Sequence, residues 1–324
     1  MGMRILAAGP LTTVQDRGRF GFMAAGFSPS GAMDDFSFSL ANILLGNDEG
    51  EAALEMTMAG ISAFFDGPAV IALTGADIEP RLDGKPVAMN RALAVGAGTV
   101  FSSSFAREGC RSYLAVAGGL ALPPVLGSRS TNLKAGIGGL AGRKLQEGDY
   151  LPFRAPCALP GMEQRVYQAP PHKAPVPGQK PGPLPLILRV VPGVQEGLFS
   201  PGGLRTFYTS VYTLSPDSDR MGIRLEGPPV ESRGGTDIVS DGIVAGAVQI
   251  PNSGQPLVLM RDRQTIGGYG KIGTVAGTDL AFLAQLLPGA PVRFKRISLR
   301  RAEGMYFRRA AYIKKLKQTL GASE

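Results

Sequence analysis

The segment Leu259–Val275, LMRDRQTIGGYGKIGTV, decides between two folds for this chain. Its residues Gly268–Gly273, GYGKIG, satisfy the G-x-G-x-x-G pattern of a dinucleotide-binding loop. Such a loop needs a strand running directly into the glycines and a helix leaving them. Here RDRQTI separates the apolar run PLVLM from the glycines, and the β-branched KIGTVAG follows them. A phosphate-binding P-loop is excluded too, because Ile272 stands where Ser or Thr would bind Mg²⁺. The segment therefore predicts strands and turns rather than a nucleotide-binding α/β fold.

The rest of the chain repeats this pattern, with 45 glycines and 26 prolines punctuating short apolar runs. The expected strands are MRILAAG (3–9), AVIALTG (69–75), TVFSSSF (99–105), RSYLAVAG (111–118), LILRVVPG (186–193), PLVLMRD (256–262) and VRFKRIS (292–298). Apolar residues at helical spacing predict helices at Met33–Leu45 and Asp279–Leu287, and a third over 300–320. These helices are too few for alternating βαβ units, so we expect a mainly β protein with antiparallel sheets closed as barrels or sandwiches.

Composition removes several classes of function. The single histidine, His172, lies in a proline-rich segment, which excludes a Ser-His-Asp triad and a multi-histidine metal site within this chain; we expect no metal site. The two cysteines, Cys110 and Cys157, cannot build a disulfide framework. No apolar run is long enough to span a membrane, and no signal peptide is apparent, so we expect a cytoplasmic protein. Much of the net charge of +8 lies in the basic C-terminal segment, which we interpret as a solvated helix face rather than a nucleic-acid site.

Ordered motifs then extend over nearly the whole chain. They are GPLTTVQDRGRFGF (9–22), SGAMD (30–34), ALEMT (53–57), ALTGAD (72–77), YLAVAGG (113–119), LGSRST (126–131), SDRMGIRLEG (218–227) and QIPNSGQPLVLMRDRQTIGGY (249–269). With these motifs the chain resembles the family of 5-oxoprolinase C components, which is also called allophanate hydrolase subunit 2 or biotin-dependent carboxyltransferase-like proteins. One departure is Gly270, where the family usually has proline.

The resemblance implies a fold of two cyclophilin-like β-barrel domains with few short helices. We place the N-terminal barrel half at 1–151, a Pro-rich linker at 152–185, the C-terminal barrel half at 186–299 and a basic helix at 300–324. It also implies one component of an ATP-dependent 5-oxoprolinase that opens 5-oxo-L-proline to L-glutamate, with B-like and A-like partner subunits and little activity alone. The sequence does not locate the ATP site of the assembled enzyme in this chain.

Two other functions remain open. A carboxyltransferase or urea amidolyase-type subunit would need biotin on a carrier lysine, and the chain has no MKM-like biotinylation sequence. A regulatory protein that antagonises a kinase inhibitor is the third possibility implied by the family.

The chemistry of the motif residues indicates a site. Opening a lactam requires cations for phosphoryl charge and a group that manages protons, and we assign these catalytic roles to Arg220 and Asp262. Replacing either with alanine is expected to abolish turnover with little loss of stability. Arg224, four residues after Arg220, is expected on the same side of a helix or strand. The remaining substrate-binding candidates are Gln249, Gln264, Gly267, Gly268, Tyr269, Lys271, Ser128, Arg129, Ser130 and Thr131.

A barrel-stabilising role for the LGSRST residues is an equal alternative. For Asp16 and Arg17 we expect an internal salt bridge.

Overall fold

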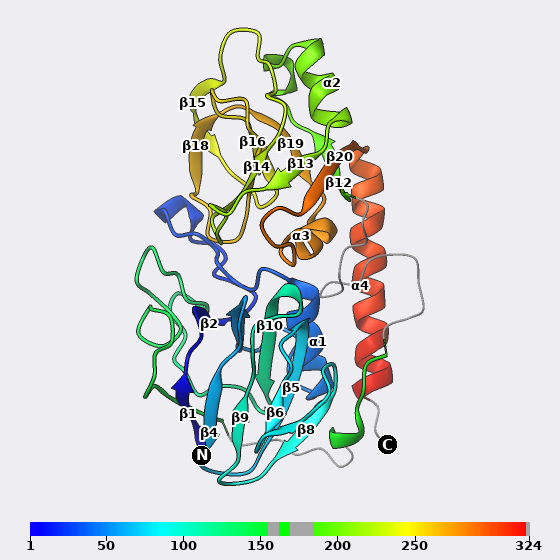
Figure 1. The fold of residues 1–324 in the computed structure, drawn as a ribbon. Helices are drawn as coiled ribbons and strands as arrows, with labels where there is room; N and C mark the ends of the chain where they lie inside the picture. Colours follow the sequence, from blue (N-terminus) through cyan, green and yellow to red (C-terminus); the bar gives the residue numbers. More distant parts are fainter. Residues whose placement is uncertain (155–161, 169–184, 322–324) are drawn as a thin grey trace. The chain divides into compact units, whose positions relative to one another are not determined.

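A computed structural model describes residues 1–154, 162–168 and 185–321 of the chain. The fold is mainly β, as predicted, and the chain forms two compact units (Figure 1). Unit 1 comprises residues 1–20, 30–180 and 312–324, and unit 2 comprises residues 21–29 and 181–311. His172, Cys157 and most of the expected linker lie outside the described residues.

Unit 1 contains two antiparallel sheets. The six-stranded sheet has the order β11-β1-β4-β9-β6-β7, with β1 Gly2–Ala7, β4 Ser62–Phe65, β6 Arg81–Leu82, β7 Lys85–Pro86, β9 Val100–Ser102 and β11 Tyr150–Pro152. The five-stranded sheet has the order β2-β3-β10-β5-β8, with β2 Leu11–Gln15, β3 Ala53–Thr57, β5 Ala69–Asp77, β8 Ala92–Val95 and β10 Glu108–Val116.

The main core of unit 1 joins apolar side chains from both sheets, among them Ile5 and Phe101 of one and Leu73 and Leu114 of the other. Helix α1, Asp35–Leu44, packs on the five-stranded sheet in a second cluster. Strand β10 therefore has apolar neighbours on both faces, and all of its residues after Glu108 are buried. This explains why the second half of the strand, YLAV (113–116), is a continuous apolar run rather than an alternating one.

Unit 2 is built on a closed barrel, with strand order β12-β19-β16-β17-β14-β13-β20. Its strands are β12 Leu186–Pro192, β13 Tyr212–Leu214, β14 Gly222–Glu226, β16 Ala247–Gln249, β17 Leu257–Leu259, β19 Lys271–Val275 and β20 Pro291–Arg296. All barrel pairs are antiparallel except β12 with β20, which are parallel. Strands β15, Asp237–Gly242, and β18, Ile266–Tyr269, form a separate two-stranded ribbon.

The helices at Met33–Leu45, Asp279–Leu287 and 300–320 are confirmed as α1, α3 (Gly277–Leu283) and α4 (Leu299–Gly321). Each predicted strand is confirmed as well. Helix α2, Pro201–Thr209, was not predicted, because its two early glycines hide the helical pattern. Its start is nonetheless typical, since the Ser200 hydroxyl caps Gly203 N–H and a proline occupies the first turn.

Two elements have unusual positions in the units. Residues 21–29, which include the short 3₁₀ turn Met23–Ala25, belong to unit 2 although unit 1 flanks them in the sequence. Helix α4 is one continuous helix, yet its residues up to Ala311 belong to unit 2 and those from Tyr312 to unit 1. None of the helices in the described ranges has the length and apolar character needed to cross a bilayer.

Candidate functional site

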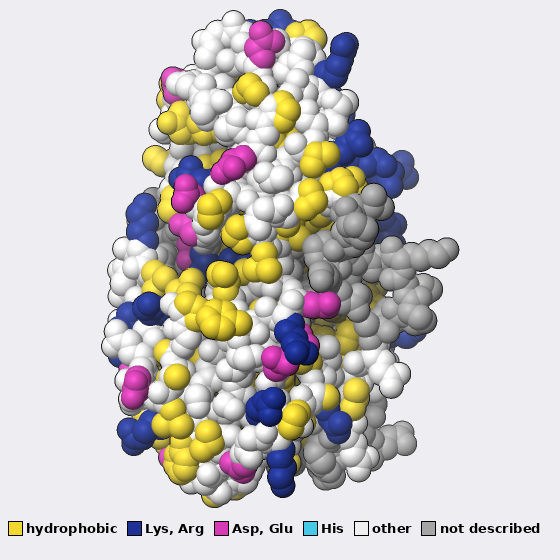
Figure 2. All heavy atoms as spheres, viewed as in Figure 1, with side chains coloured by type: hydrophobic (Ala, Val, Ile, Leu, Met, Phe, Trp, Pro, Cys, Tyr) yellow, Lys and Arg dark blue, Asp and Glu magenta, His cyan; other side chains and the backbone are white. Residues whose placement is uncertain are grey.

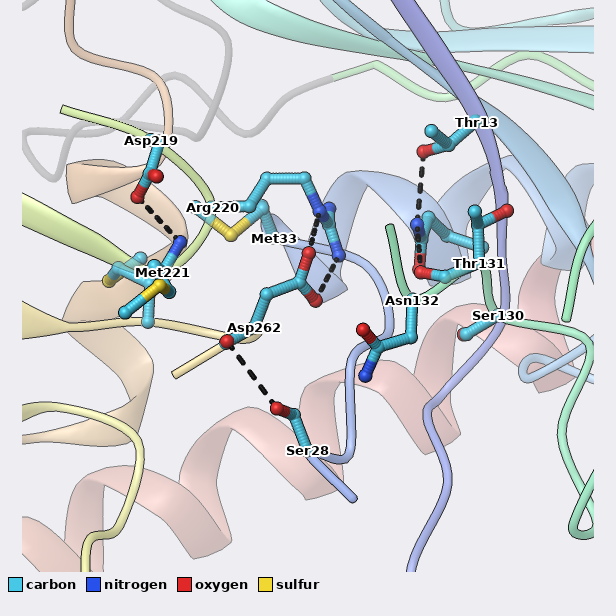
Figure 3. A network of polar contacts seen from close by, with 12 residues as sticks. Thr13, Ser28, Met33, Ser130, Thr131, Asn132, Asp219, Arg220, Met221 and Asp262 are labelled. Carbon is cyan, nitrogen blue, oxygen red and sulfur yellow. Dashed lines mark hydrogen bonds and ion pairs between the residues drawn. The ribbon is translucent and has the colours of Figure 1, made fainter. Parts of the chain in front are cut away.

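Arg220 and Asp262 form a two-pronged ion pair inside unit 2 (Figure 3). Arg220 Nε donates to Asp262 Oδ2 at 2.9 Å and Nη2 donates to Oδ1 at 3.2 Å. The two side chains are only 5% and 11% exposed. Such fork-shaped pairing is the strong geometry for a guanidinium and a carboxylate. Both carboxylate oxygens are therefore engaged, so Asp262 can act as a base only if this pair opens.

The backbone fixes this pair from both sides. Asp262 N–H donates to Arg220 O at 2.9 Å, extending the ladder that pairs β14 with β17. The Asp219 carboxylate accepts from the N–H groups of Met221 and Gly222, which holds the turn that presents Arg220. On the other side, the Ser28 hydroxyl donates to Arg263 O at 2.7 Å. The sequence motif SDRMG thus acts as a rigid support for one buried guanidinium.

Arg263, next to Asp262, is a second buried guanidinium. It is 6% exposed, with Nε donating to Ile243 O and Nη1 to Met260 O, both at 3.2 Å. Burial, together with the positive charge of Arg261, lowers the pKa of Arg263 to about 10. Its contacts to main-chain oxygens indicate a structural role in closing the loop after β17.

Arg224 does not share the environment of Arg220, contrary to the expectation from their spacing. Arg220 lies in the turn before β14 and is buried, whereas Arg224 lies within β14 and is exposed. The alternation rule does not apply, because the two residues are not on one regular strand.

The glutamines and glycines of the long motif do come together. Gln249 ends β16, is 1% exposed, and donates from Nε2 to Tyr269 O at 3.3 Å. A Cβ atom placed on Gly267 would lie 2.8 Å from Gln249 Nε2 and 3.4 Å from Gln264 Nε2. The backbone of β18 at Gly267 therefore lies directly against both side-chain amides. Gly268 follows in the same strand, opposite β15, and the Tyr269 side chain is 40% exposed.

Lys271 faces the ribbon rather than the amides. Its Nζ donates to Asp241 Oδ2 at 2.9 Å and to Gly242 O at 3.2 Å. The hydrogen bond from Lys271 is the main reason why the pKa of Asp241 is lowered. Because the Asp241 side chain is 57% exposed, this pair is a surface feature with little effect on stability.

The LGSRST residues surround the carboxylate of Asp16 in unit 1. Ser128 Oγ and Ser130 Oγ donate to Asp16 Oδ1 at 2.7 and 2.5 Å, and the Arg129 N–H donates to Oδ2 at 2.5 Å. Thr131 bonds to Val14 O through its N–H at 2.9 Å and its hydroxyl at 3.0 Å. These donors are used inside the fold, which favours the stabilising role over substrate binding.

The expected Asp16–Arg17 salt bridge is wrong. Arg17 pairs with Glu49, while Asp16 is surrounded by the hydroxyl and backbone donors just described. The neighbouring side chain of Gln15 connects the same segment to the LGSRST loop, because its Nε2 donates to Thr13 Oγ1 and to Thr131 O. Asp16 and Arg17 follow the end of β2, and the Asp16 carboxylate also accepts from Gly18 N–H at 2.7 Å, so its oxygens are occupied by donors other than Arg17.

Sequence reasoning missed a buried polar group under α1. Tyr113 OH donates to Glu55 Oε2 at 2.8 Å and accepts from Asp34 N–H at 2.8 Å. Glu55 and Tyr113 are 1% and 0% exposed, and burial raises the pKa of Tyr113 well above its ordinary value. The signal that could have found this group is the acid in ALEMT, at a position otherwise occupied by core residues.

Basic residues follow one another on the surface of unit 2. Exposed basic residues follow one another along β20 and the start of α4: Arg293, Lys295, Arg296, Arg300 and Arg301. Figure 2 shows a group of Lys and Arg side chains at the upper right edge of the drawn face and others scattered over the rest of it. Within the described ranges, no group of three or more His, Cys, Asp or Glu residues is placed to hold a metal ion.

Comparison with known proteins connects this arrangement to a family. The profile for "Carboxyltransferase domain, subdomain A and B" matches residues 25–296. The chain is 40% identical over 304 residues to the C component of 5-oxoprolinase from Escherichia coli, covering 93% of both chains. It is 37% identical to the C component of 5-oxoprolinase from Haemophilus influenzae, covering 94% of both.

Among solved structures, the urea amidolyase of K. lactis superimposes with a TM-score of 0.85 at 29% identity. That match covers 97% of this chain but only 20% of the amidolyase. The fold of this chain therefore also occurs as one part of a much larger enzyme.

Proposed function

The chain belongs to the carboxyltransferase-domain family, subdomains A and B, and on that premise we propose that it is the C component of an ATP-dependent 5-oxoprolinase. In this role it would help to open the lactam ring of 5-oxo-L-proline to give L-glutamate, together with B-like and A-like partner subunits. The observation that carries the proposal is the pair of bacterial relatives named as the C component of 5-oxoprolinase, matched at 40% and 37% identity over more than nine-tenths of both chains.

The chemistry of lactam opening fits the residue types of unit 2. An amide is a poor electrophile, so its carbonyl must be activated before water attacks, and polar groups aimed at the developing charge assist that step. Unit 2 supplies the buried amide of Gln249, the partly exposed amide of Gln264 and a preorganised guanidinium at Arg220. The Arg220–Asp262 pair would act as a fixed wall of the site rather than as a mobile acid or base, because each partner neutralises the other.

ATP, when bound in the assembly, would supply the energy that makes ring opening favourable. The residues Gly267–Gly273 do not form a phosphate-binding loop, because they run through strands β18 and β19 instead of leading into a helix N-terminus. We therefore assign no step involving ATP to this chain, and we expect a partner protein to bind it.

A second candidate has support of its own. The match to the K. lactis urea amidolyase, with its TM-score of 0.85, favours a carboxyltransferase-type subunit that would act on carboxybiotin carried by another protein. We rank it second because the match covers only a fifth of that enzyme, whereas the 5-oxoprolinase relatives are covered almost completely.

Reconstitution tests the proposal. The chain should be assayed alone, with a B-like partner, and with both B-like and A-like partners, for ATP-dependent formation of glutamate from 5-oxo-L-proline. We expect turnover only in the three-component assembly. Full turnover by the isolated chain would contradict the dependence on partners. A silent three-component assembly, combined with biotin-dependent carboxylation of urea, would replace the proposal with the second candidate.

A further inference from the structure

Arg263 is a buried cation whose hydrogen-bond acceptors are all neutral. The residue is 6% exposed, and its Nε and Nη1 donate to the main-chain oxygens of Ile243 and Met260. Among the residues that the structure describes, no carboxylate forms an ion pair with it. The adjacent acid, Asp262, is engaged by Arg220 instead. Because buried charges are normally paired, Arg263 would gain from a stronger acceptor than those it has.

The third contact of Arg263 is a weak one, made to a methionine. Arg263 Nη2 donates to Met23 Sδ at 3.9 Å, and a thioether sulfur is a poor acceptor. Met23 begins the short 3₁₀ turn and is partly exposed to solvent. Ser28 ties the same segment to Arg263, because its hydroxyl donates to Arg263 O at 2.7 Å. Residues 21–29 are therefore held to unit 2 by one strong and one weak contact to the same arginine.

Oxidation would turn the Met23 sulfur into a strong acceptor. With hydrogen peroxide, a sulfur lone pair attacks one peroxide oxygen and the O–O bond breaks. The proton of the transferred oxygen leaves with the departing hydroxide as water, so sulfur is oxidised to the sulfoxide while peroxide is reduced. The 3.9 Å between Sδ and Nη2 exceeds the usual N–H···O length of about 2.9 Å. An oxygen on the side of the sulfur that faces Arg263 consequently comes within hydrogen-bond reach.

We propose that Met23 is an oxidation site whose sulfoxide accepts a hydrogen bond from Arg263 and fastens residues 21–29 to unit 2. Oxidation of a packed methionine ordinarily weakens a fold, because it makes an apolar side chain polar. At Met23 the sign is reversed, since the new oxygen faces a buried guanidinium that has no charged partner in the described chain. Hydrogen bonds to charged groups are the stronger class, so oxidation of Met23 stabilises unit 2. The oxidation site is independent of the reaction proposed above.

Thermal melting of reduced and oxidised protein tests this sign. The wild-type chain and Met23→Leu are each melted before and after treatment with hydrogen peroxide, and peptide mass spectrometry gives the oxidised fraction of every methionine. Subtracting the shift of Met23→Leu from that of the wild type removes the effects of the other methionines. The remaining shift is expected to be an increase of roughly 2–6 °C, corresponding to one hydrogen bond to a charged group. A zero or negative remainder would overturn the proposal. So would a Met23 that stays reduced while Met58, which is 46% exposed, is fully oxidised.

A permanent acceptor at position 23 gives a second measurement that needs no oxidant. Met23→Gln places an amide oxygen near the position of the sulfoxide oxygen and is expected to raise the melting temperature of untreated protein. The matched control is Met58→Gln, because the sulfur of this exposed methionine accepts no hydrogen bond within the described ranges. Equal gains in both variants would reveal a general effect of polarity and contradict the role of Arg263. In an Arg263→Met background, which lacks the donor, Met23→Gln should give no gain.

Amide hydrogen exchange locates the effect in the chain. The N–H groups of residues 25–27 donate to the main-chain oxygens of Phe22 and Met23. If the sulfoxide fastens this segment, these amides should exchange more slowly in oxidised than in reduced wild-type protein, because local opening becomes less frequent. The same amides in Met23→Leu should exchange at one rate before and after peroxide. Unchanged or faster exchange in the wild type, with Met23 oxidised, would contradict the proposal even if the melting temperature rose.

Discussion

Removing one partner of the Arg220–Asp262 pair should destabilise the protein strongly, in contrast to the small loss expected from the sequence. In Arg220→Ala, the Asp262 carboxylate, whose side chain is 11% exposed in the wild type, loses two hydrogen bonds of 2.9 and 3.2 Å. A buried charge left without its partner costs about 3–5 kcal/mol of unfolding free energy. Urea denaturation followed by circular dichroism should show this loss, and Asp262→Ala should also lower the free energy of unfolding. Turnover should fall with the folded fraction and with the lost wall of the site.

The double variant Arg220→Met/Asp262→Leu separates pairing from packing. Because it removes both charges and keeps much of the volume, its stability should lie near or above that of the wild type, as for other buried pairs replaced by apolar groups. Arg296→Ala is the matched control, since its ion pair with Glu196 is 57% and 17% exposed and should contribute about 1 kcal/mol or less. A loss below about 1 kcal/mol in Arg220→Ala, or a double variant as unstable as the single ones, would refute this reasoning.

Three further predictions concern other buried polar groups. Asp16→Ala should lower the unfolding free energy in urea denaturation by about 3 kcal/mol or more, because the Ser128 and Ser130 hydroxyls lose a charged acceptor. Asp16→Asn keeps one side-chain oxygen and should lower the unfolding free energy by less. Tyr212→Phe should be neutral or stabilising in thermal melting, since its buried hydroxyl has no partner in the described chain; a clear loss would show that the hydroxyl is satisfied. Because the pKa of Tyr113 is raised in the folded protein, its contribution to stability is complete below the ordinary tyrosine pKa of about 10 and is lost as the pH rises above that value. The melting temperature should therefore fall less steeply between pH 9 and 11 in Tyr113→Phe than in the wild type.

The sequence was sufficient to predict the fold class and most elements. Strand β10 and helix α1 follow from apolar runs, turn residues and caps, which act locally. The closure of the seven-stranded barrel in unit 2 does not follow from such local signals, because it depends on which strands pair across long stretches of sequence. The parallel pairing of β12 with β20 is an example, since more than ninety residues separate Val190 from its partner Arg296.

The candidate site was predicted by residue type and not by geometry. The residues Gln249, Gln264 and Gly267 were expected near one another and do lie together. Asp262 was expected to manage protons, yet its environment is that of a buried ion pair. Pairing of this kind depends on the Arg220 turn lying opposite the end of β17, which no local pattern encodes.

The division of residues between the units has a practical consequence for dissecting the molecule. The chain passes from one unit to the other at four places, after residues 20, 29, 180 and 311, and the last of these lies inside helix α4. A single cleavage between residues 180 and 181 would leave each fragment carrying a piece that belongs to the other unit. Cutting at a protease site introduced there should consequently yield two fragments that copurify under native conditions, and neither half should be expressible as an independently folded protein.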